Sequence, residues 1–223
     1  HSGVTLASRS ILTDYERGEE MLTLYHSTQA PHMNQALFAK HLNLEEHKVR
    51  IICRDVGGAF GLKAHAYGDE FATAAISKIL GRPVKFVADR MESFLADIHA
   101  RDHVVKGKIG ISAAGKILAI EIDDLTGIGP FSVYPRSSGM EVNQVCNLTG
   151  GPYKFDNYKA RGRVVFLNKP PMCQYRAVGH PIAITVTEGL VEMAASAIGM
   201  ESMKMRKLNM VADDDYPNKT VSG

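Results

Sequence analysis

Hydrophobic and polar positions alternate along some stretches of the chain and recur every three or four residues along others. Both strands and helices are therefore predicted. Short apolar or alternating runs indicate strands, and residues 103–125 hold two such runs around a turn-like segment at 112–116, which predicts an antiparallel hairpin. The other predicted strands lie within residues 4–12, 22–29, 48–54, 84–88 and 158–167.

Helical spacing of apolar residues predicts helices over residues 31–44, 64–80, 182–198 and 201–209, with a short one near 91–95. In the second of these, one apolar face is expected, formed by Phe71, Ala74, Ala75, Ile79 and Leu80. The strand, glycine turn, helix and strand between residues 48 and 88 form a βαβ-like unit, so parallel strands are expected there. The fold class is therefore α+β, a mixed sheet with helices packed on it.

The composition is that of an ordinary globular chain. Its 223 residues, 45% apolar and 22% charged, suffice for one large domain or two small ones, and a division near residues 100–125 is one option. The net charge of +2 comes from scattered Lys and Arg, which does not indicate nucleic-acid binding. No apolar run is long enough to span a membrane. Since the chain starts with His1 and shows no signal peptide, we expect a fragment or a processed chain.

The cysteines bear on metals and on the cellular compartment. Only three are present, Cys53, Cys146 and Cys173, and no two form a Cys-x-x-Cys pair. An iron–sulfur cluster or a structural zinc held by this chain alone is therefore not expected. A small, odd number of cysteines fits a reducing cytoplasm.

The glycine-rich stretch GGAFGLK at residues 57–63 is the most unusual local signal. A strand, a glycine turn and a helix can aim backbone N–H groups at an oxyanion or a phosphate, and a tight turn that binds nothing is the alternative. No Ser or Thr follows Lys63, as a nucleotide-binding P-loop requires, and the glycine spacing differs from the dinucleotide motif.

Two further polar residues stand at bends. Gln29 lies where a strand ends and a helix begins, and helix capping is its simpler role. Arg176 lies between apolar neighbours near Gly179 and Pro181, where it can hold an anion or bond loop carbonyls. Together with the glycine turn, these neutral donors and one arginine suit a bound anionic cofactor better than a nucleophile.

Other titratable residues have weaker indications. The spacing of His26, His32 and His65 does not favour a zinc site, and His99 and His103 are expected in a solvated segment. Asp69 and Glu70 begin a helix, so capping is favoured over acid–base catalysis, because the helix dipole stabilises negative charge at that end.

Four stretches in this order resemble the molybdenum-binding subunit of the xanthine dehydrogenase, aldehyde oxidase and aerobic carbon monoxide dehydrogenase family. They are STQAPH at 27–32, GGAFGLK at 57–63, GRPVK at 81–85 and YRAVGHP at 175–181, and MRKLN at 205–209 is similar to the end of a family helix. The resemblance covers nearly the whole chain and implies the first half of a molybdenum hydroxylase subunit over residues 1–223, with the fold of the first molybdopterin-binding domain.

The resemblance also implies roles for particular residues. Gln29 would hydrogen-bond an oxo group on molybdenum, and backbone N–H groups around Gly58, Ala59, Phe60 and Gly61 would contact the oxo ligand and the pterin dithiolene. Arg176 and Ala177 would line the metal from the opposite side. The protein then orients the ligands while the metal performs the chemistry, and no side chain of this chain ligates the metal directly.

Three departures from the family pattern narrow the expectation. The family's base glutamate lies in a Gly-x-Gly-Glu-like motif that is absent here, so no catalytic residue is expected in this chain. Ala64 stands where xanthine enzymes carry a substrate-contacting glutamate, which argues against a purine substrate. Ala177 stands where the carbon monoxide enzyme carries its copper-binding cysteine, so a molybdenum–copper centre is not expected, and Cys173 is expected to pack.

The resulting hypothesis is a cytoplasmic oxidoreductase that hydroxylates an aldehyde or an N-heterocycle only together with other chains. Expected partners are a second molybdenum-binding half-subunit, a [2Fe–2S] subunit and an FAD subunit, and the molybdopterin can take the cytosine dinucleotide form. A non-catalytic scaffold that only binds partners is one alternative, and a nucleotide-binding protein that uses the glycine turn alone is another.

Overall fold

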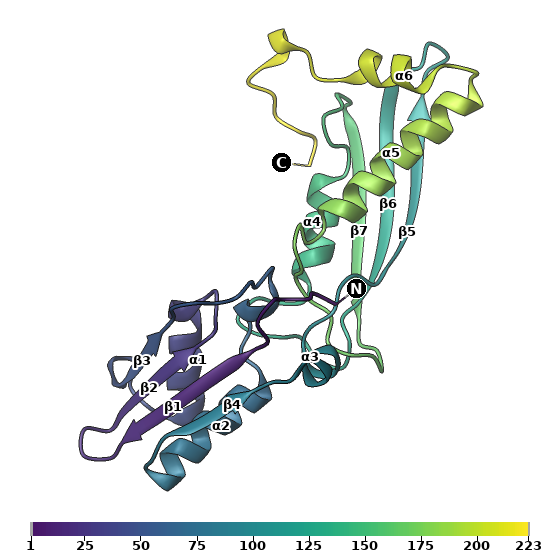
Figure 1. The fold of residues 1–223 in the computed structure, drawn as a ribbon. Helices are drawn as coiled ribbons and strands as arrows, with labels where there is room; N and C mark the ends of the chain where they lie inside the picture. Colours follow the sequence, from purple (N-terminus) through teal and green to yellow (C-terminus); the bar gives the residue numbers. More distant parts are fainter. Residues whose placement is uncertain (1, 223) are drawn as a thin grey trace. The chain divides into compact units, whose positions relative to one another are not determined.

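The computed structural model describes residues 2–222, which form two compact units (Figure 1). The first unit contains the chain up to residue 101 together with residues 129–138 and 168–176. The second contains residues 102–128 and 139–167 and the chain from residue 177 onward. Both units are discontinuous in sequence, because the chain returns twice to the first one.

The first unit is built on a four-stranded mixed sheet in the order β3-β2-β1-β4. The central strands β1 and β2 are antiparallel, β3 runs parallel to β2, and β4 runs antiparallel to β1. The bounds of the strands are Ser10–Glu16 for β1, Met21–His26 for β2, Val49–Ile52 for β3 and Val84–Val87 for β4.

Helices α1 (Pro31–Leu42) and α2 (Gly68–Leu80) cover one face of this sheet (Figure 1). Apolar side chains alternate along β1 and β2, so one face of the strands meets the helices in a continuous core. This core is formed by Ile11, Tyr15, Leu22, Leu24, Phe38, Ala39, Val49 and Ala74. Helix α3 (Arg90–Ala96) follows β4, and single 3-10 turns lie at Glu46–Lys48 and Leu62–Ala64.

The second unit is built on a three-stranded sheet in the order β5-β6-β7. Strands β5 (His103–Ile111) and β6 (Ile117–Gly127) form an antiparallel hairpin, and β7 (Asn157–Val165) lies parallel to β6. Helices α4 (Met140–Leu148), α5 (His180–Ala197) and α6 (Ser202–Asn209) complete the unit, with a 3-10 turn at Asp213–Asp215. Leu190 and Val191 of α5 and Val145 of α4 bury against the inner face of β6.

The α+β prediction is confirmed, since both sheets are mixed and helices pack on them. The hairpin over residues 103–125, the strand near 158–167 and the helices near 182–198 and 201–209 are confirmed as well. Within residues 2–222, no single helix is long and apolar enough to cross a membrane. Helices α5 and α6 meet both conditions, length and apolar composition, only as a pair, and a bend of 117° separates them.

The helix predicted over residues 64–80 begins only at Gly68. Its predicted apolar face is confirmed for Phe71 and Ala74, which pack in the core of the first unit, and wrong for Ile79 and Leu80. Its buried face contains Thr73, Ala74 and Ser77, whereas Ile79 and Leu80 are exposed. The reason is hydrogen bonding: the Ser77 hydroxyl accepts the N–H of Tyr15 at 3.1 Å, so a polar side chain is satisfied where an apolar one was expected.

The parallel direction expected for the two strands of the βαβ-like unit is confirmed, since β3 and β4 run the same way. They are not neighbours, because β2 and β1 lie between them. Helix α4 was not predicted, and strand β6 extends to Gly127, two residues beyond the end of the predicted hairpin. A nine-residue helix between glycine- and serine-containing loops has too few turns for its apolar spacing to be recognised in the sequence.

Candidate functional site

The glycine turn connects β3 with the 3-10 turn at Leu62–Ala64, and its backbone is left-handed at four positions. The φ angles are 67° at Gly57, 89° at Gly58, 53° at Phe60 and 109° at Gly61. Positive φ is uncommon outside glycine and is often found at functional sites, so Phe60 marks a turn held by its surroundings. The Phe60 ring is 44% exposed, so it contributes little to the core.

Gly61 is required by close packing as well as by its φ angle. A Cβ atom at this position would lie 2.3 Å from the backbone oxygen of Gln174. The N–H of Arg176 donates to the oxygen of Phe60 at 2.8 Å, which joins the same two segments. Two of the stretches singled out in the sequence are therefore in contact through their backbones.

Gln29 is the third predicted site residue, and it contacts the same turn. Its side-chain Oε1 accepts the N–H of Gly61 at 3.0 Å, and its own N–H donates to the oxygen of Lys63 at 3.0 Å. Because the Gly61 amide can only donate, the orientation of the Gln29 amide is determined and its Nε2 donor is directed elsewhere. Among the described residues, that Nε2 has no acceptor, and Gln29 does not cap α1.

Arg176 is exposed, and its guanidinium bonds to none of residues 2–222. The alternative in which Arg176 bonds loop carbonyls is therefore wrong. The arginine that does so is Arg101, whose Nη2 donates to the oxygen of Arg176. Arg101 also lies over the ring of Tyr175, with 5.7 Å between its Cζ and the ring centroid.

The turn presents a row of backbone donors. The N–H groups of Gly58, Ala59 and Phe60 donate to no atom within the part of the chain that the structure describes. The Nε2 of Gln29 and the guanidinium of Arg176 add a further neutral donor and a cation to this row. Such a set fits a large anionic ligand whose oxygens and sulfurs accept hydrogen bonds.

The sequence profile of the molybdopterin cofactor-binding domain matches residues 1–210. The chain belongs to this family. The nicotine 6-hydroxylase large subunit of Paenarthrobacter nicotinovorans is 31% identical over 216 residues, which cover 96% of this chain and 26% of that protein. The carbon monoxide dehydrogenase large chain of Hydrogenophaga pseudoflava is 29% identical over 207 residues, covering 91% of this chain and 25% of that protein.

The fold also matches that of a solved structure. The crystal structure of quinoline 2-oxidoreductase from Pseudomonas putida 86 superimposes with a TM-score of 0.95 at 29% identity, covering this whole chain and 28% of that one. The resemblance to the molybdenum hydroxylase family is thus confirmed. The chain spans about a quarter of the length of these relatives.

In this molybdopterin-binding domain, Lys63 holds the glycine turn from inside. Its side chain is buried, and its ammonium donates to the oxygens of Ala7, at 2.9 Å, and of Val56. Burial lowers the pKa of Lys63. The backbone oxygen of Lys63 accepts both the N–H of Gln29 and the Thr28 hydroxyl, at 3.0 and 2.8 Å. The backbone oxygen of Lys63 therefore helps to position Gln29. The sequence motif did not indicate this role.

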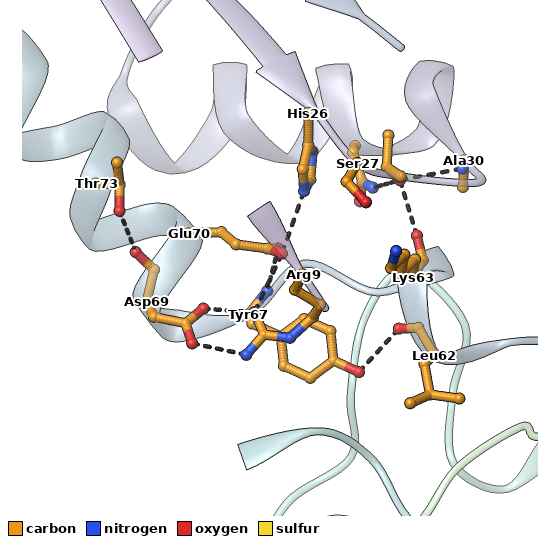
Figure 2. A network of polar contacts seen from close by, with 12 residues as sticks. Arg9, His26, Ser27, Ala30, Leu62, Lys63, Tyr67, Asp69, Glu70 and Thr73 are labelled. Atoms are coloured by element: carbon orange, nitrogen blue, oxygen red, sulfur yellow. Dashed lines mark hydrogen bonds and ion pairs between the residues drawn. The ribbon is translucent and has the colours of Figure 1, made fainter. Parts of the chain in front are cut away.

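A buried charge network supports the start of α2 (Figure 2). The guanidinium of Arg9, 1% exposed, binds both oxygens of Asp69 at 2.7 Å and contacts Glu70 at 3.1 Å and Asp97 at 2.5 Å. Burial opposes the charge of Arg9, but the bonds to Asp69 and the charge of Glu70 more than compensate and raise its pKa. Glu70 also accepts the N–H of Tyr67 at 3.1 Å, so capping is confirmed for this carboxylate.

Sequence reasoning did not identify Arg9 as part of this network. The available signal was an arginine directly before a strand whose alternate residues are buried, since a charge on the core side of a strand needs partners. The partners, however, lie 60 to 88 residues away along the chain, and only the tertiary structure brings them together.

Ala177, the last predicted site residue, begins a segment of the second unit. Its φ is 72° and that of Val178 is 49°, so two successive non-glycine residues are left-handed. The oxygen of Ala177 accepts the N–H of His180 at 2.9 Å, and the Nδ1 of His180 lies 2.8 Å from the same oxygen. This small turn precedes α5 and displays Ala177 at the surface.

The solvated segment predicted around His103 is wrong. His103 lies in β5 with its side chain only 2% exposed and contacts Asp124 and Glu141. His26 contacts Glu70 and His65 contacts the oxygen of Tyr134, at 3.2 and 3.1 Å. Within residues 2–222, no group of three or more His, Cys, Asp and Glu side chains could hold a metal ion. Cys173 is fully buried in an apolar cluster, so its packing role is confirmed.

Proposed function

We propose that this chain forms one wall of the molybdopterin site in a multi-subunit molybdenum hydroxylase. The observation that carries the proposal is the contact between the Oε1 of Gln29 and the N–H of Gly61. This contact leaves the Nε2 of Gln29 as a donor, in addition to the N–H groups of Gly58, Ala59 and Phe60, which have no acceptor within residues 2–222. A neutral donor wall of this kind suits the oxygen- and sulfur-rich periphery of a molybdopterin.

When bound, the molybdenum cofactor supplies two-electron oxidation of a substrate carbon with oxygen derived from water. The residues of this chain orient it. Gln29 donates a hydrogen bond to the cofactor from its Nε2, and the N–H groups of Gly58, Ala59 and Phe60 donate hydrogen bonds to its anionic atoms. Gly61 leaves room for the segment that carries Arg176, and the Arg176 guanidinium balances negative charge. Ala177, a residue of the second unit, is proposed as a cofactor contact from the family resemblance alone.

The proposed substrate is an aldehyde or an N-heterocycle. The names of the relatives support this class, since two of them act on nicotine and quinoline, both of which are N-heterocycles. The general base is a glutamate outside this chain. The proposed partners are a second molybdenum-binding part, a [2Fe–2S] subunit and an FAD subunit, and the cytosine dinucleotide is a candidate form of the pterin. The small, odd number of cysteines supports the cytoplasm as the proposed site of action.

The test is metal and pterin analysis of the complete protein, purified with the chains that accompany it. We expect molybdenum and a molybdopterin in the complex, together with hydroxylation of an aldehyde or N-heterocycle. A complex that is active without molybdenum would refute the proposal. A stable complex without either cofactor or activity would favour the partner-binding scaffold instead.

A paired substitution tests the wall itself. Gln29→Ala removes both the acceptor for the Gly61 N–H and the free donor, so molybdopterin content should fall severalfold. Gln35→Ala is the matched control, because Gln35 also bonds backbone atoms, the oxygens of Glu46 and Val49, but lies on α1 away from the turn. Equal cofactor content in the two variants would remove Gln29 from the site.

A further inference from the structure

A buried polar cluster in the second unit joins β5, β6 and α4. The Nδ1 of His103 lies 2.9 Å from Asp124 Oδ2 and 2.9 Å from the hydroxyl of Thr126, and its Nε2 lies 3.4 Å from Glu141 Oε2. The side chains of His103, Asp124 and Glu141 are each at most 2% exposed. His103 is thus the bridge between the sheet and the first turn of α4.

The charges of the cluster favour a protonated His103. Burial lowers the pKa of His103, but the hydrogen bonds to Asp124 and Glu141 outweigh it and raise the pKa to about 9. The two carboxylates are the charged groups that face the imidazole, one from β6 and one from α4. The charge of Asp124 also acts on the thiol of Cys146 on α4. A neutral imidazole would leave two buried carboxylates without a cation.

Helix α4 in turn holds the turn that contains Ala177. The N–H of Gly179 donates to the Oε1 of Gln144 at 3.1 Å. A Cβ at Gly179 would lie 2.6 Å from the oxygen of Glu141 and 2.8 Å from the nitrogen of Val145, so the turn rests directly on the helix backbone. The left-handed conformation of Ala177 is unfavourable for an L-residue and persists only where neighbouring contacts impose it.

We propose that His103 is a positioning residue for the Ala177 turn. It anchors the first turn of α4 to the sheet through Glu141, and α4 then holds Gly179 through Gln144. The relevance of this clamp to catalysis rests on the proposed function, in which Ala177 lines the cofactor. The clamp itself is a property of the second unit and can be measured without the cofactor.

The sign of the pH dependence follows from the raised pKa. Opening of the cluster returns His103 to its ordinary pKa of 6.5. Between pH 6.5 and about 9, His103 is therefore protonated in the closed cluster and largely neutral in the open one. The stabilisation of the clamp is complete below pH 6.5, declines as the pH rises and is lost above about pH 9. The amide of Gly179 should lose protection against hydrogen exchange over the same range, by about tenfold or more.

The experiment measures amide hydrogen exchange in the complete protein, using short peptides that cover residues 176–182, with α1 as an internal reference. The variants are His103→Gln and the matched control His47→Gln, since His47 also lies beside a carboxylate, Glu45, but is exposed. His103→Gln should speed exchange at Gly179 about tenfold at pH 6.5 and remove its excess pH dependence. His47→Gln and the α1 reference should remain unchanged.

Unchanged protection of Gly179 in His103→Gln, or a wild-type protection factor that is constant from pH 6.5 to 9, would overturn the proposal. The wild-type pH series decides the matter even where His103→Gln fails to fold. Gln144→Ala should also lower the protection of the Gly179 amide against exchange. Gln144→Glu retains the acceptor and should keep this protection. Molybdenum content is measured in parallel: lost protection with full molybdenum content would support the clamp and remove Ala177 from the cofactor wall.

Discussion

Replacing Gly61 with alanine is the most direct perturbation of the contact between the glycine turn and the segment that carries Arg176. The new Cβ would lie 2.3 Å from the oxygen of Gln174, whereas ordinary van der Waals contact begins near 3.4 Å. One of the two segments must therefore move by about 1 Å. In addition, alanine would have to adopt a φ of 109°, which L-residues rarely do.

The magnitude shows how the strain is relieved. The unfavourable backbone conformation costs about 1–3 kcal/mol and the steric overlap about as much again, so the strain is roughly 2–6 kcal/mol. Breaking the hydrogen bond from the Arg176 N–H to the Phe60 oxygen costs only about 1 kcal/mol. Displacement of the Arg176 segment removes the steric overlap and leaves the backbone cost. It is cheaper than retaining the overlap, so Gly61→Ala should fold with this segment moved away from the turn.

The assay combines denaturant unfolding with molybdopterin analysis of the purified complex. Gly199→Ala is the matched control: Gly199 also has a positive φ, 65°, but an added Cβ would meet no atom within 4 Å. We expect Gly199→Ala to lose about 1–2 kcal/mol of unfolding free energy. Gly61→Ala should lose about 2–3 kcal/mol, because it also breaks the hydrogen bond between Arg176 and Phe60. Only Gly61→Ala should lose cofactor, by about tenfold for each 1.4 kcal/mol of binding energy.

Equal molybdopterin content in Gly61→Ala and Gly199→Ala would refute this reasoning. The contact between the two segments would then be a packing feature, without consequence for the cofactor. A Gly61→Ala variant that lost several kcal/mol of stability and kept its cofactor would show that the segment is held more firmly than the single hydrogen bond indicates.

Two further predictions concern the first unit. Burial lowers the pKa of His65 to about 4, so between pH 6.5 and 4 the unfolded chain binds a proton that the folded chain does not. The unfolding free energy should fall by about 3 kcal/mol as the pH drops through this window, and His65→Gln should lack that decline in urea titrations. Arg9→Met leaves the carboxylates of Asp69, Glu70 and Asp97 without their cation and should cost about 3–5 kcal/mol in the same titrations. The control Arg17→Met removes an exposed arginine that donates to the Ile79 oxygen, and an equal loss there would contradict the argument.

The sequence by itself determined the family, the α+β class and most of the helices and strands. These features are written in local signals: β-branched runs, a proline at the first turn of α1, and a glycine cluster with unusual spacing. The family motifs also located Gln29, the glycine turn and Arg176, which the structure brings into one unit through contacts at 3.0 and 2.8 Å.

Only the tertiary structure decided how these residues are held. Local periodicity indicates which face of an element is apolar, but it does not indicate which polar groups find partners in the interior. Ser77 therefore replaces apolar residues on the buried face of α2, and Arg9 is surrounded by carboxylates from distant segments. His103 was placed in solvent because its sequence neighbours are charged, whereas the register of β5 with β6 turns its side chain into the core.

The physical reason is that hydrogen bonds and ion pairs depend on atoms that approach to about 3 Å, and residues far apart in sequence reach that distance only through the fold. Lys63 illustrates this best. The sequence shows a lysine after a glycine turn, and the structure shows an ammonium buried beneath it, bonded to the oxygens of Ala7 and Val56. The motif names the candidate site residues, and the fold determines which of them orient the others.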